Sequence, residues 1–172
     1  MTRYMRTADT AKLLRKALRA AHPAVKFSVR SDVYAGGASI RVGWTDGPTE
    51  AAVRATTELY CGATFDGMTD MKTYHSTLLA EVESGQVEEV HLGADFVFTT
   101  RELTADLLNR IAETITDLGH CTIPTQCRPC GEWMRGDCLA AHVPGGHVQL
   151  VCSPLCGARL VARATDATAA GV

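Results

Sequence analysis

The chain has 172 residues, 46% of them apolar and 21% charged, which is the composition of a folded globular protein and excludes a disordered one. Seventeen basic and nineteen acidic residues give a formal net charge of -2, which argues against a protein that coats DNA regardless of sequence. No apolar run reaches the roughly 18 residues of a membrane span, and no apolar core follows the first six residues as in a signal peptide. We therefore expect a cytoplasmic protein with no membrane partner.

The first expected element is a helix from Thr7 to Arg19 or Ala20. Thr7 is a candidate N-cap, leucines recur along one face, and Pro23 follows the end. The other face is basic, with Lys12, Arg15, Lys16 and Arg19. Such a face is more often a solvated surface than a nucleic-acid contact, and we retain it as a candidate binding surface.

Two half-buried strands and a second helix follow. Apolar and polar side chains alternate over residues 25–30 and 40–44, and a glycine-containing turn at residues 34–38 joins the two runs into a hairpin. The second helix is expected over residues 49–60, with Cys61-Gly62 at its end.

Residues 63–75 are polar but rich in aromatic and methionine side chains, which predicts a loop that packs down onto the fold. Asp66, Asp70 and His75 make this loop the nearest approach to an acid–base cluster. Further candidates for such chemistry are Cys61, His91 and Asp95. Ordinary turn chemistry explains aspartates beside glycine and threonine better than catalysis does.

The next elements are a short helix over residues 76–83, a strand over residues 87–99 and a long helix that starts at Thr99 or Thr100. Gly93 predicts a bulge within the strand. The long helix is expected because an apolar stripe recurs every three or four residues: Leu103, Leu107, Ile111, Ile115 and Leu118.

Six segments of this part of the chain resemble one known family in combination. They are the Thr-Ala-Asp-x-Ala-Lys-Leu-Leu-Arg opening at Thr7, Phe27-Ser28-Val29-Arg30, Gly37-Ala38-Ser39-Ile40-Arg41-Val42, Trp44-Thr45-Asp46-Gly47-Pro48, Phe65-Asp66-Gly67-Met68-Thr69-Asp70 and Gly93-Ala94-Asp95-Phe96-Val97-Phe98. Together they resemble the large polyvalent protein-associated domain of type 29, over roughly residues 5–118. The resemblance implies a protein of a bacteriophage or other mobile element, in the cytoplasm of a host bacterium, often beside anti-defence or nucleic-acid-processing modules. It implies no activity and no catalytic residues.

Five of the seven cysteines crowd into residues 127–156. Without an export signal, metal binding is favoured over disulfides. Cys127 and Cys130 form one short-spaced pair, Cys152 and Cys156 form another, and two such pairs suit one tetrahedral Zn²⁺. A hairpin over residues 139–151, followed by a helix capped by Ser153, would resemble a treble-clef finger.

Other candidate ligands lie nearby: His120, Cys121, Cys138, His142 and His147. Each of them would replace a member of a short-spaced pair, so the set of four paired cysteines is preferred. Four thiolates leave no coordination position for water, and the expected cofactor is therefore a single structural zinc ion.

The elements together predict an α+β fold. We expect a small antiparallel sheet of about three strands with helices packed on one face, followed by a C-terminal zinc-finger module of knuckle, hairpin and helix. The expected boundaries are 1–119 for the α+β domain, 120–165 for the module and 166–172 for a frayed tail.

Two hypotheses for function remain open. The first is a non-enzymatic, zinc-binding accessory protein of a phage or mobile element that binds a host protein or nucleic acid, in host takeover or anti-defence. Its candidate surfaces are the basic face of the first helix and a second group around the module: Arg128, Trp133, Arg135, Arg159 and Arg163. The alternative is an enzyme that acts on nucleic acid or nucleotide through the Asp66–His75 loop, which matches no known catalytic signature.

Overall fold

The computed structural model describes residues 2–80, 87–113, 115–127, 129–143 and 147–165. The chain divides into two compact units: an N-terminal unit of residues 1–44 and 50–100, and a C-terminal unit of residues 45–49 and 101–172. The predicted domains divide the chain at residue 119, and that boundary stays a prediction. The predicted frayed tail lies outside the described residues.

The N-terminal unit is organised on a sheet of three strands in the order β2-β3-β8: Ser28–Tyr34, Gly37–Thr45 and Phe96–Glu102. β2 and β3 form the predicted antiparallel hairpin. Just before β8, the backbone N–H of Asp95 donates to the carbonyl of Ala38 near the start of β3. At the other end, the N–H of Asp46 donates to the carbonyl of Glu102, so β8 runs parallel to β3. The sheet is therefore mixed rather than purely antiparallel, because a crossover containing a helix joins β3 to β8.

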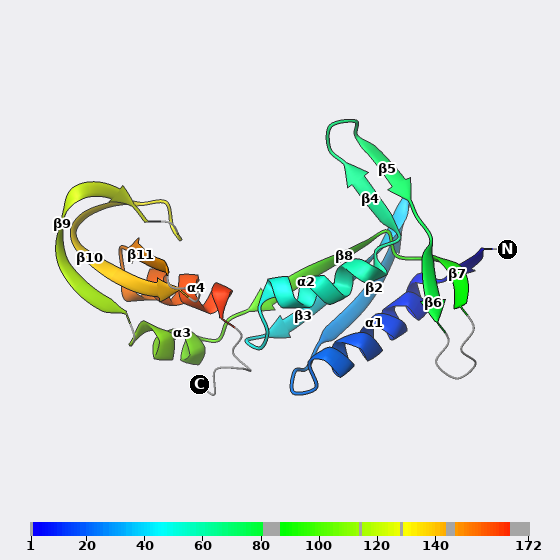
Figure 1. Ribbon diagram of the computed structural model, residues 1–172, viewed down its shortest axis with the longest axis horizontal. Helices are drawn as coiled ribbons and strands as arrows, with labels where there is room; N and C mark the ends of the chain where they lie inside the picture. Colours follow the sequence, from blue (N-terminus) through cyan, green and yellow to red (C-terminus); the bar gives the residue numbers. More distant parts are fainter. Residues whose placement is uncertain (1, 81–86, 114, 128, 144–146, 166–172) are drawn as a thin grey trace. The chain divides into compact units, whose positions relative to one another are not determined.

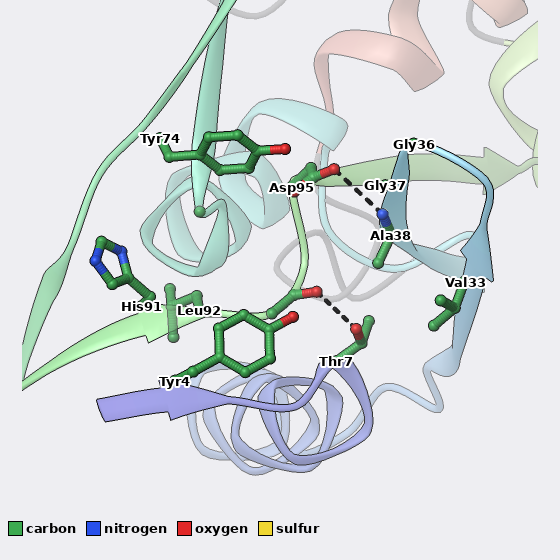
Figure 2. Close-up of a pocket in the computed structure, with 12 residues that line it drawn as sticks. Tyr4, Thr7, Val33, Gly36, Gly37, Ala38, Tyr74, His91, Leu92 and Asp95 are labelled. Atoms are coloured by element: carbon green, nitrogen blue, oxygen red, sulfur yellow. Dashed lines mark hydrogen bonds between the residues drawn. The ribbon is translucent and has the colours of Figure 1, made fainter. Parts of the chain in front are cut away.

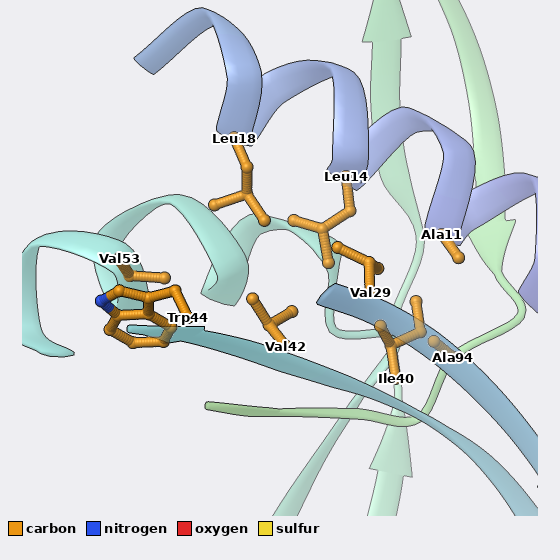
Figure 3. Close-up of a cluster of buried hydrophobic side chains, with 9 residues drawn as sticks. All are labelled: Ala11, Leu14, Leu18, Val29, Ile40, Val42, Trp44, Val53 and Ala94. Carbon is orange, nitrogen blue, oxygen red and sulfur yellow. The ribbon is translucent and has the colours of Figure 1, made fainter. Parts of the chain in front are cut away.

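Two helices cover one face of this sheet, as predicted: α1, Thr7–Ala21, and α2, Glu50–Thr57, which a short 3-10 helix, η1, continues over Glu58–Tyr60. Figure 3 shows the apolar core between the helices and the strands. Its buried members are Ala11, Leu14, Leu18, Val29, Ile40, Val42, Trp44, Val53 and Ala94. The 3.6-residue period of α1 and the two-residue alternation of β3 bring these side chains to the same interface.

The predicted cap of α1 is wrong by one residue. Arg6 occupies the N-cap position with extended backbone, and no side chain caps the helix there. The hydroxyl of Thr7 instead donates to the carbonyl of Gly93 at 2.6 Å. This long-range hydrogen bond fixes the start of α1 to the chain segment between β7, Val87–Leu92, and β8.

A second sheet has the strand order β1-β7-β6, in which β1 is Arg3–Met5 and β6 is Thr77–Ala80. β1 runs parallel to β7 and β6 runs antiparallel to it. The predicted helix over residues 76–83 is therefore wrong in its described part, because pairing with β7 outweighs the local helix signal. The predicted strand over residues 87–99 is two strands, separated at Gly93, where a Cβ would lie 2.2 Å from the carbonyl oxygen of Met5.

The predicted loop over residues 63–75 is a hairpin of β4, Ala63–Asp66, and β5, Met71–Tyr74. Figure 1 shows it extending away from the strands of the N-terminal unit. The expectation that its large side chains pack down is wrong, since Phe65, Met71 and Tyr74 are more than half exposed and Met68 is 97% exposed.

The C-terminal unit begins with a shorter helix than predicted. α3 spans Ala105–Ala112 and is capped by Thr104, whose hydroxyl accepts from the N–H of Leu107. Residues 116–118, predicted as helix, belong to β9, Thr116–Gln126, where Thr116 pairs with Ala140. The predicted apolar stripe therefore does not form one helix, because Leu118, its last member, belongs to a strand.

The rest of this unit follows the predicted order of knuckle, hairpin and helix. β10, Trp133–Val143, pairs antiparallel with β11, His147–Val151, and with β9. α4, Pro154–Ala164, lies against this curved sheet (Figure 1). The buried core residues here are small or medium in size: Cys127, Ala141 and Val151.

Arg101 holds the 45–49 turn and the end of α4 together within the C-terminal unit. Its guanidinium donates to the carbonyl oxygens of Asp46, Gly47, Ala162 and Thr165, at distances of 2.6 to 3.1 Å. The carboxylate of Asp46 accepts from both the N–H and the hydroxyl of Thr104. The last carbonyls of α4 are therefore satisfied by a side chain from the end of β8.

Candidate metal centre

The first cysteine pair lies in a tight turn between β9 and β10. The N–H of Gly131 donates to the carbonyl of Cys127 at 2.7 Å, and the N–H of Cys127 donates to the carbonyl of Glu132 at 2.8 Å. Gly131 has φ 77°, a left-handed conformation that glycine adopts without strain. This geometry folds the backbone back beneath two sulfur atoms, one from buried Cys127 and one from exposed Cys130.

The second pair lies where β11 passes into α4, as predicted. Ser153 is the N-cap of α4, and its hydroxyl oxygen accepts from the N–H of Cys156 at 3.2 Å. Cys156 therefore lies in the first turn of the helix, and Cys152 directly precedes the cap. The positive end of the helix dipole favours a thiolate at this position.

The four sulfur atoms converge on one point. All four Sγ atoms of Cys127, Cys130, Cys152 and Cys156 lie within 4.8 Å of one another. The Cys152 sulfur is 3.5 Å from that of Cys130 and 3.6 Å from that of Cys156. A disulfide would need about 2.05 Å, whereas a tetrahedron with metal–sulfur bonds of about 2.3 Å has edges of about 3.8 Å. The spacing therefore fits four thiolates around one metal ion.

Without a cation, such a cluster resists ionisation. Desolvation, followed by hydrogen bonding with the neighbouring thiols, raises the pKa of Cys152 to about 12. Several thiolates in so small a volume repel one another, and a bound divalent cation removes that penalty. The site has four ligands and needs no water to complete a tetrahedron.

The side chains of the other candidate ligands lie outside the described residues: His120, Cys121, Cys138, His142 and His147. The same holds for three members of the predicted binding surface: Arg128, Trp133 and Arg135. The remaining two, Arg159 and Arg163, are exposed and lie one turn apart on α4.

The basic face of α1 is partly neutralised. The ammonium of Lys12 lies 3.0 Å from the Asp9 carboxylate, whose pKa is lowered first by Lys12 and then by Arg6. The guanidinium of Arg15 donates to the carbonyl of Val29 at 2.8 Å. Two members of the predicted face, Lys16 and Arg19, are exposed and form no ion pair with any described residue.

Asp66 and His75 lie at opposite ends of the hairpin, and Asp70 lies in its turn with a φ of 53°. Asp66 accepts from the N–H of Met68 and the hydroxyl of Thr69, as in an ordinary turn, and these bonds lower its pKa. Asp66 and Met71 form the last pair at the tip of the hairpin. His75 follows the opposite end, with its Nε2 2.9 Å from the carbonyl of Cys61. Three residue steps of about 3.3 Å separate the two ends of this hairpin, which is too far for direct proton transfer.

No hydrogen bond or ion pair joins the other catalytic candidates, Cys61, Asp95 and His91, to one another. Burial raises the pKa of the Cys61 thiol, which makes it a poor nucleophile near neutral pH. Asp95 is buried and forms an ion pair with Lys72 at 2.9 Å. His91 on β7 is exposed and lines the same cavity as Asp95, and its Nδ1 lies 3.4 Å from the carbonyl oxygen of His75.

Comparison with protein families matches residues 5–104 to the family described as "Large polyvalent protein associated domain 29". The chain belongs to this family. The matched segment ends before the cysteine cluster, so the candidate metal centre lies outside it. No curated protein and no solved structure was found to match the chain. Among the described residues, no helix is long and apolar enough to cross a membrane.

One cavity lies inside the family segment, and it is lined by residues from several of the sequence segments that resemble the family. It has a volume of about 660 Å³, and Thr7, Gly37, Ala38, Gly93 and Asp95 are part of its lining (Figure 2). The glycines allow close backbone approach: a Cβ on Gly37 would lie 2.2 Å from the Asp95 carboxylate. Sequence reasoning missed this cavity. The signal that was available is the presence of glycine next to small residues in two of the resembling segments.

Proposed function

We propose that the chain is an accessory protein of a phage or other mobile element that acts by binding a host protein, and that it does so without catalysis. In this proposal it works in the cytoplasm of the host bacterium and belongs to host takeover or anti-defence. Family membership supports the mobile-element setting.

The exposed β4–β5 hairpin is the observation that carries the proposal. Phe65 pairs with Lys72 and Ala63 pairs with Tyr74, so Phe65 and Tyr74 lie on the same face of the hairpin. Met68 lies at the tip and is almost fully exposed. Large aromatic and methionine side chains gathered at one projecting element are typical of protein-binding surfaces.

The proposed metal is one zinc ion bound by Cys127, Cys130, Cys152 and Cys156. Thiolate sulfur favours zinc over magnesium, calcium and manganese, and zinc accepts a closed tetrahedral site. A closed site supports structure rather than catalysis. The separation of Asp66 from His75 likewise gives no support to the alternative of an enzyme acting on nucleic acid or nucleotide.

The test is affinity capture from host lysate, with and without nuclease, at low and high salt. The probe proteins are the full chain, the double variant Phe65→Ser/Met68→Ser, and Leu59→Ser as a control. Leu59 is also a large exposed side chain, at 68%, but it lies on η1 outside the hairpin. We expect capture of a specific host protein that survives nuclease and salt, persists in the control and is lost in the hairpin variant. Retention of the same protein by the hairpin variant would refute the assignment.

A second candidate is nucleic-acid binding, favoured by the adjacent exposed arginines Arg159 and Arg163 on α4. The net charge of -2 counts against it. A steep fall of affinity with salt, reduced in Arg159→Ala/Arg163→Ala, would support nucleic acid over a protein partner.

A further inference from the structure

We infer that the cavity of the N-terminal unit binds a nucleobase that carries an exocyclic amino group, such as adenine or cytosine. This inference goes beyond the proposed function, which concerns the hairpin. It is carried by a buried carboxylate with one open oxygen, by aromatic side chains on two sides, and by the charge of the lining.

The carboxylate is that of Asp95, which is only 7% exposed. Its Oδ2 accepts from the N–H of Ala38 at 3.2 Å and from the ammonium of Lys72 at 2.9 Å. Oδ1 accepts no hydrogen bond from a described residue. Because no buried side-chain oxygen or nitrogen of the described residues lacks a partner, Oδ1 is accessible, and Asp95 lines the cavity. The cavity wall therefore offers a fixed acceptor for one N–H group.

Lys72 decides whether the Asp95 oxygen favours a charged or an uncharged N–H donor. Its ammonium also donates to the carbonyl of Gly36 at 3.0 Å and lies 4.8 Å from the centre of the Tyr74 ring. Hydrogen bonds with Tyr74 and Asp95 raise the pKa of Lys72, so this charge persists at neutral pH. A second cation would be repelled by the ammonium, and the Asp95 oxygen therefore favours an uncharged amino group.

Tyrosines form two sides of the cavity. Tyr4 from β1 and Tyr74 from β5 lie on opposite sides of it (Figure 2), and they are 67% and 59% exposed. Exposed tyrosine rings beside a cavity offer stacking faces for a planar ring. The volume of about 660 Å³ falls within the range of about 300–1,000 Å³ usual for small-molecule sites.

The described lining contains no lysine or arginine, so it does not provide the cationic cluster that recognises phosphate. The recognised part is thus the base. Uracil and thymine lack an amino group, and their ring N–H lies between two carbonyl oxygens that a carboxylate repels. A base with a free amino edge fits the Asp95 oxygen better.

The experiment is calorimetric titration of the full chain with adenosine, cytidine, uridine and thymidine, and with the single strands dA12 and dT12. We expect adenosine and cytidine to bind at least tenfold more tightly than uridine and thymidine. Tighter binding of dA12 than of adenosine would identify a strand as the source of the base, and equal binding per base would identify a free nucleoside. No binding of any of these probes, or equal binding of uridine and adenosine, overturns the inference.

Substitutions of Tyr4 sharpen the test. Tyr4→Ala should weaken adenosine binding roughly tenfold or more while Tyr4→Phe retains it, because stacking needs the ring and not the hydroxyl. Phe98→Ala is the control, an exposed aromatic residue on β8 outside the lining. Affinity that is unchanged in Tyr4→Ala contradicts the inference.

Asp95→Asn should reverse the order of affinities for the nucleosides. The N–H of Ala38 and the ammonium of Lys72 both need an acceptor, so the amide oxygen keeps the Oδ2 position. The amide nitrogen then takes the Oδ1 position and presents a donor to the cavity. Uridine and thymidine, which have a carbonyl at that edge, should bind this variant more tightly than adenosine does, and an unaltered order of affinities in the folded variant contradicts the role of Asp95.

Discussion

Removal of the proposed zinc ion should unfold the cysteine module, formed by β9, β10, β11 and α4, and leave the N-terminal unit intact. The perturbation is a chelator, or the variant Cys127→Ser, which replaces the one fully buried sulfur of the cluster. The two units differ in how their cores are made. Among the described residues of the module core, Val151 is the largest side chain that is fully buried, whereas Leu14, Leu18 and Ile40 are all fully buried in the N-terminal unit.

The expected loss of structure follows from how little apolar burial stabilises the module without a metal ion. A structural zinc site contributes an apparent binding free energy of about 10–16 kcal/mol at neutral pH. A whole domain has a net stability of only about 5–15 kcal/mol. Full burial of a valine such as Val151 contributes about 1.5–3 kcal/mol, far less than a metal site of that strength, and the apolar residues packed around it are only partly buried. We therefore expect complete loss of ordered structure in the module rather than a shift of its unfolding midpoint.

The assay is amide NMR with far-UV circular dichroism, before and after chelation, together with metal content by elemental analysis. Signals of Ala140, Ala141 and Val151 should collapse to random-coil positions, while those of Leu14 and Ile40 stay. Cys61→Ser is the matched control, because Cys61 lies in the N-terminal unit outside the cluster. Unchanged module signals in a protein shown to be metal-free would falsify the assignment of the four cysteines.

Three further outcomes are expected. Arg101→Ala should destabilise the C-terminal unit by about 2–5 kcal/mol in urea unfolding, since four carbonyls lose a charged donor, while Arg110→Ala on exposed α3 should change stability little. Gly93→Ala should cost about 1–3 kcal/mol or more because its Cβ would meet backbone at 2.2 Å, whereas Gly67→Ala meets nothing within 4 Å; equal stabilities would refute this reasoning. Hydrogen bonds from Met68 and Thr69 lower the pKa of Asp66, so they stabilise the turn at pH values above the ordinary aspartate pKa, and this contribution is lost as the pH falls through the lowered pKa of the folded protein. An NMR titration should therefore give Asp66 a midpoint below the ordinary aspartate pKa of about 3.9, and a midpoint at or above that value contradicts the turn.

The features predictable from sequence were those set by near neighbours in the chain. Cysteine spacing identified the cluster because each pair lies in one tight turn, and Ser153 identified the start of α4 because its hydroxyl reaches only three residues ahead. The apolar period of α1 was equally local. These predictions needed no knowledge of the rest of the fold.

The errors came from partners far away in sequence. Thr7 has the chemistry of an N-cap, but Gly93, 86 residues away, takes its hydroxyl. Residues 116–118 continue a helical stripe, but β10 pairs with them. The cavity was missed for the same reason, since Tyr4, Tyr74 and Asp95 meet only through two sheets and a hairpin.

One hydrogen-bond network joins residues of the family segment to the helix that carries Cys156. α4 carries Cys156 in its first turn, and its last carbonyls accept from Arg101, a residue of the matched segment. Asp46 and Thr104, which complete this network, lie in the same segment. The helix that supplies a sulfur to the cluster is thus held at its other end by family residues within one compact unit. A chain that ended at residue 119 would lack Ala162 and Thr165, whose carbonyl oxygens are two of the four acceptors of Arg101. The family segment, which ends at residue 104, therefore cannot form this network completely without the module.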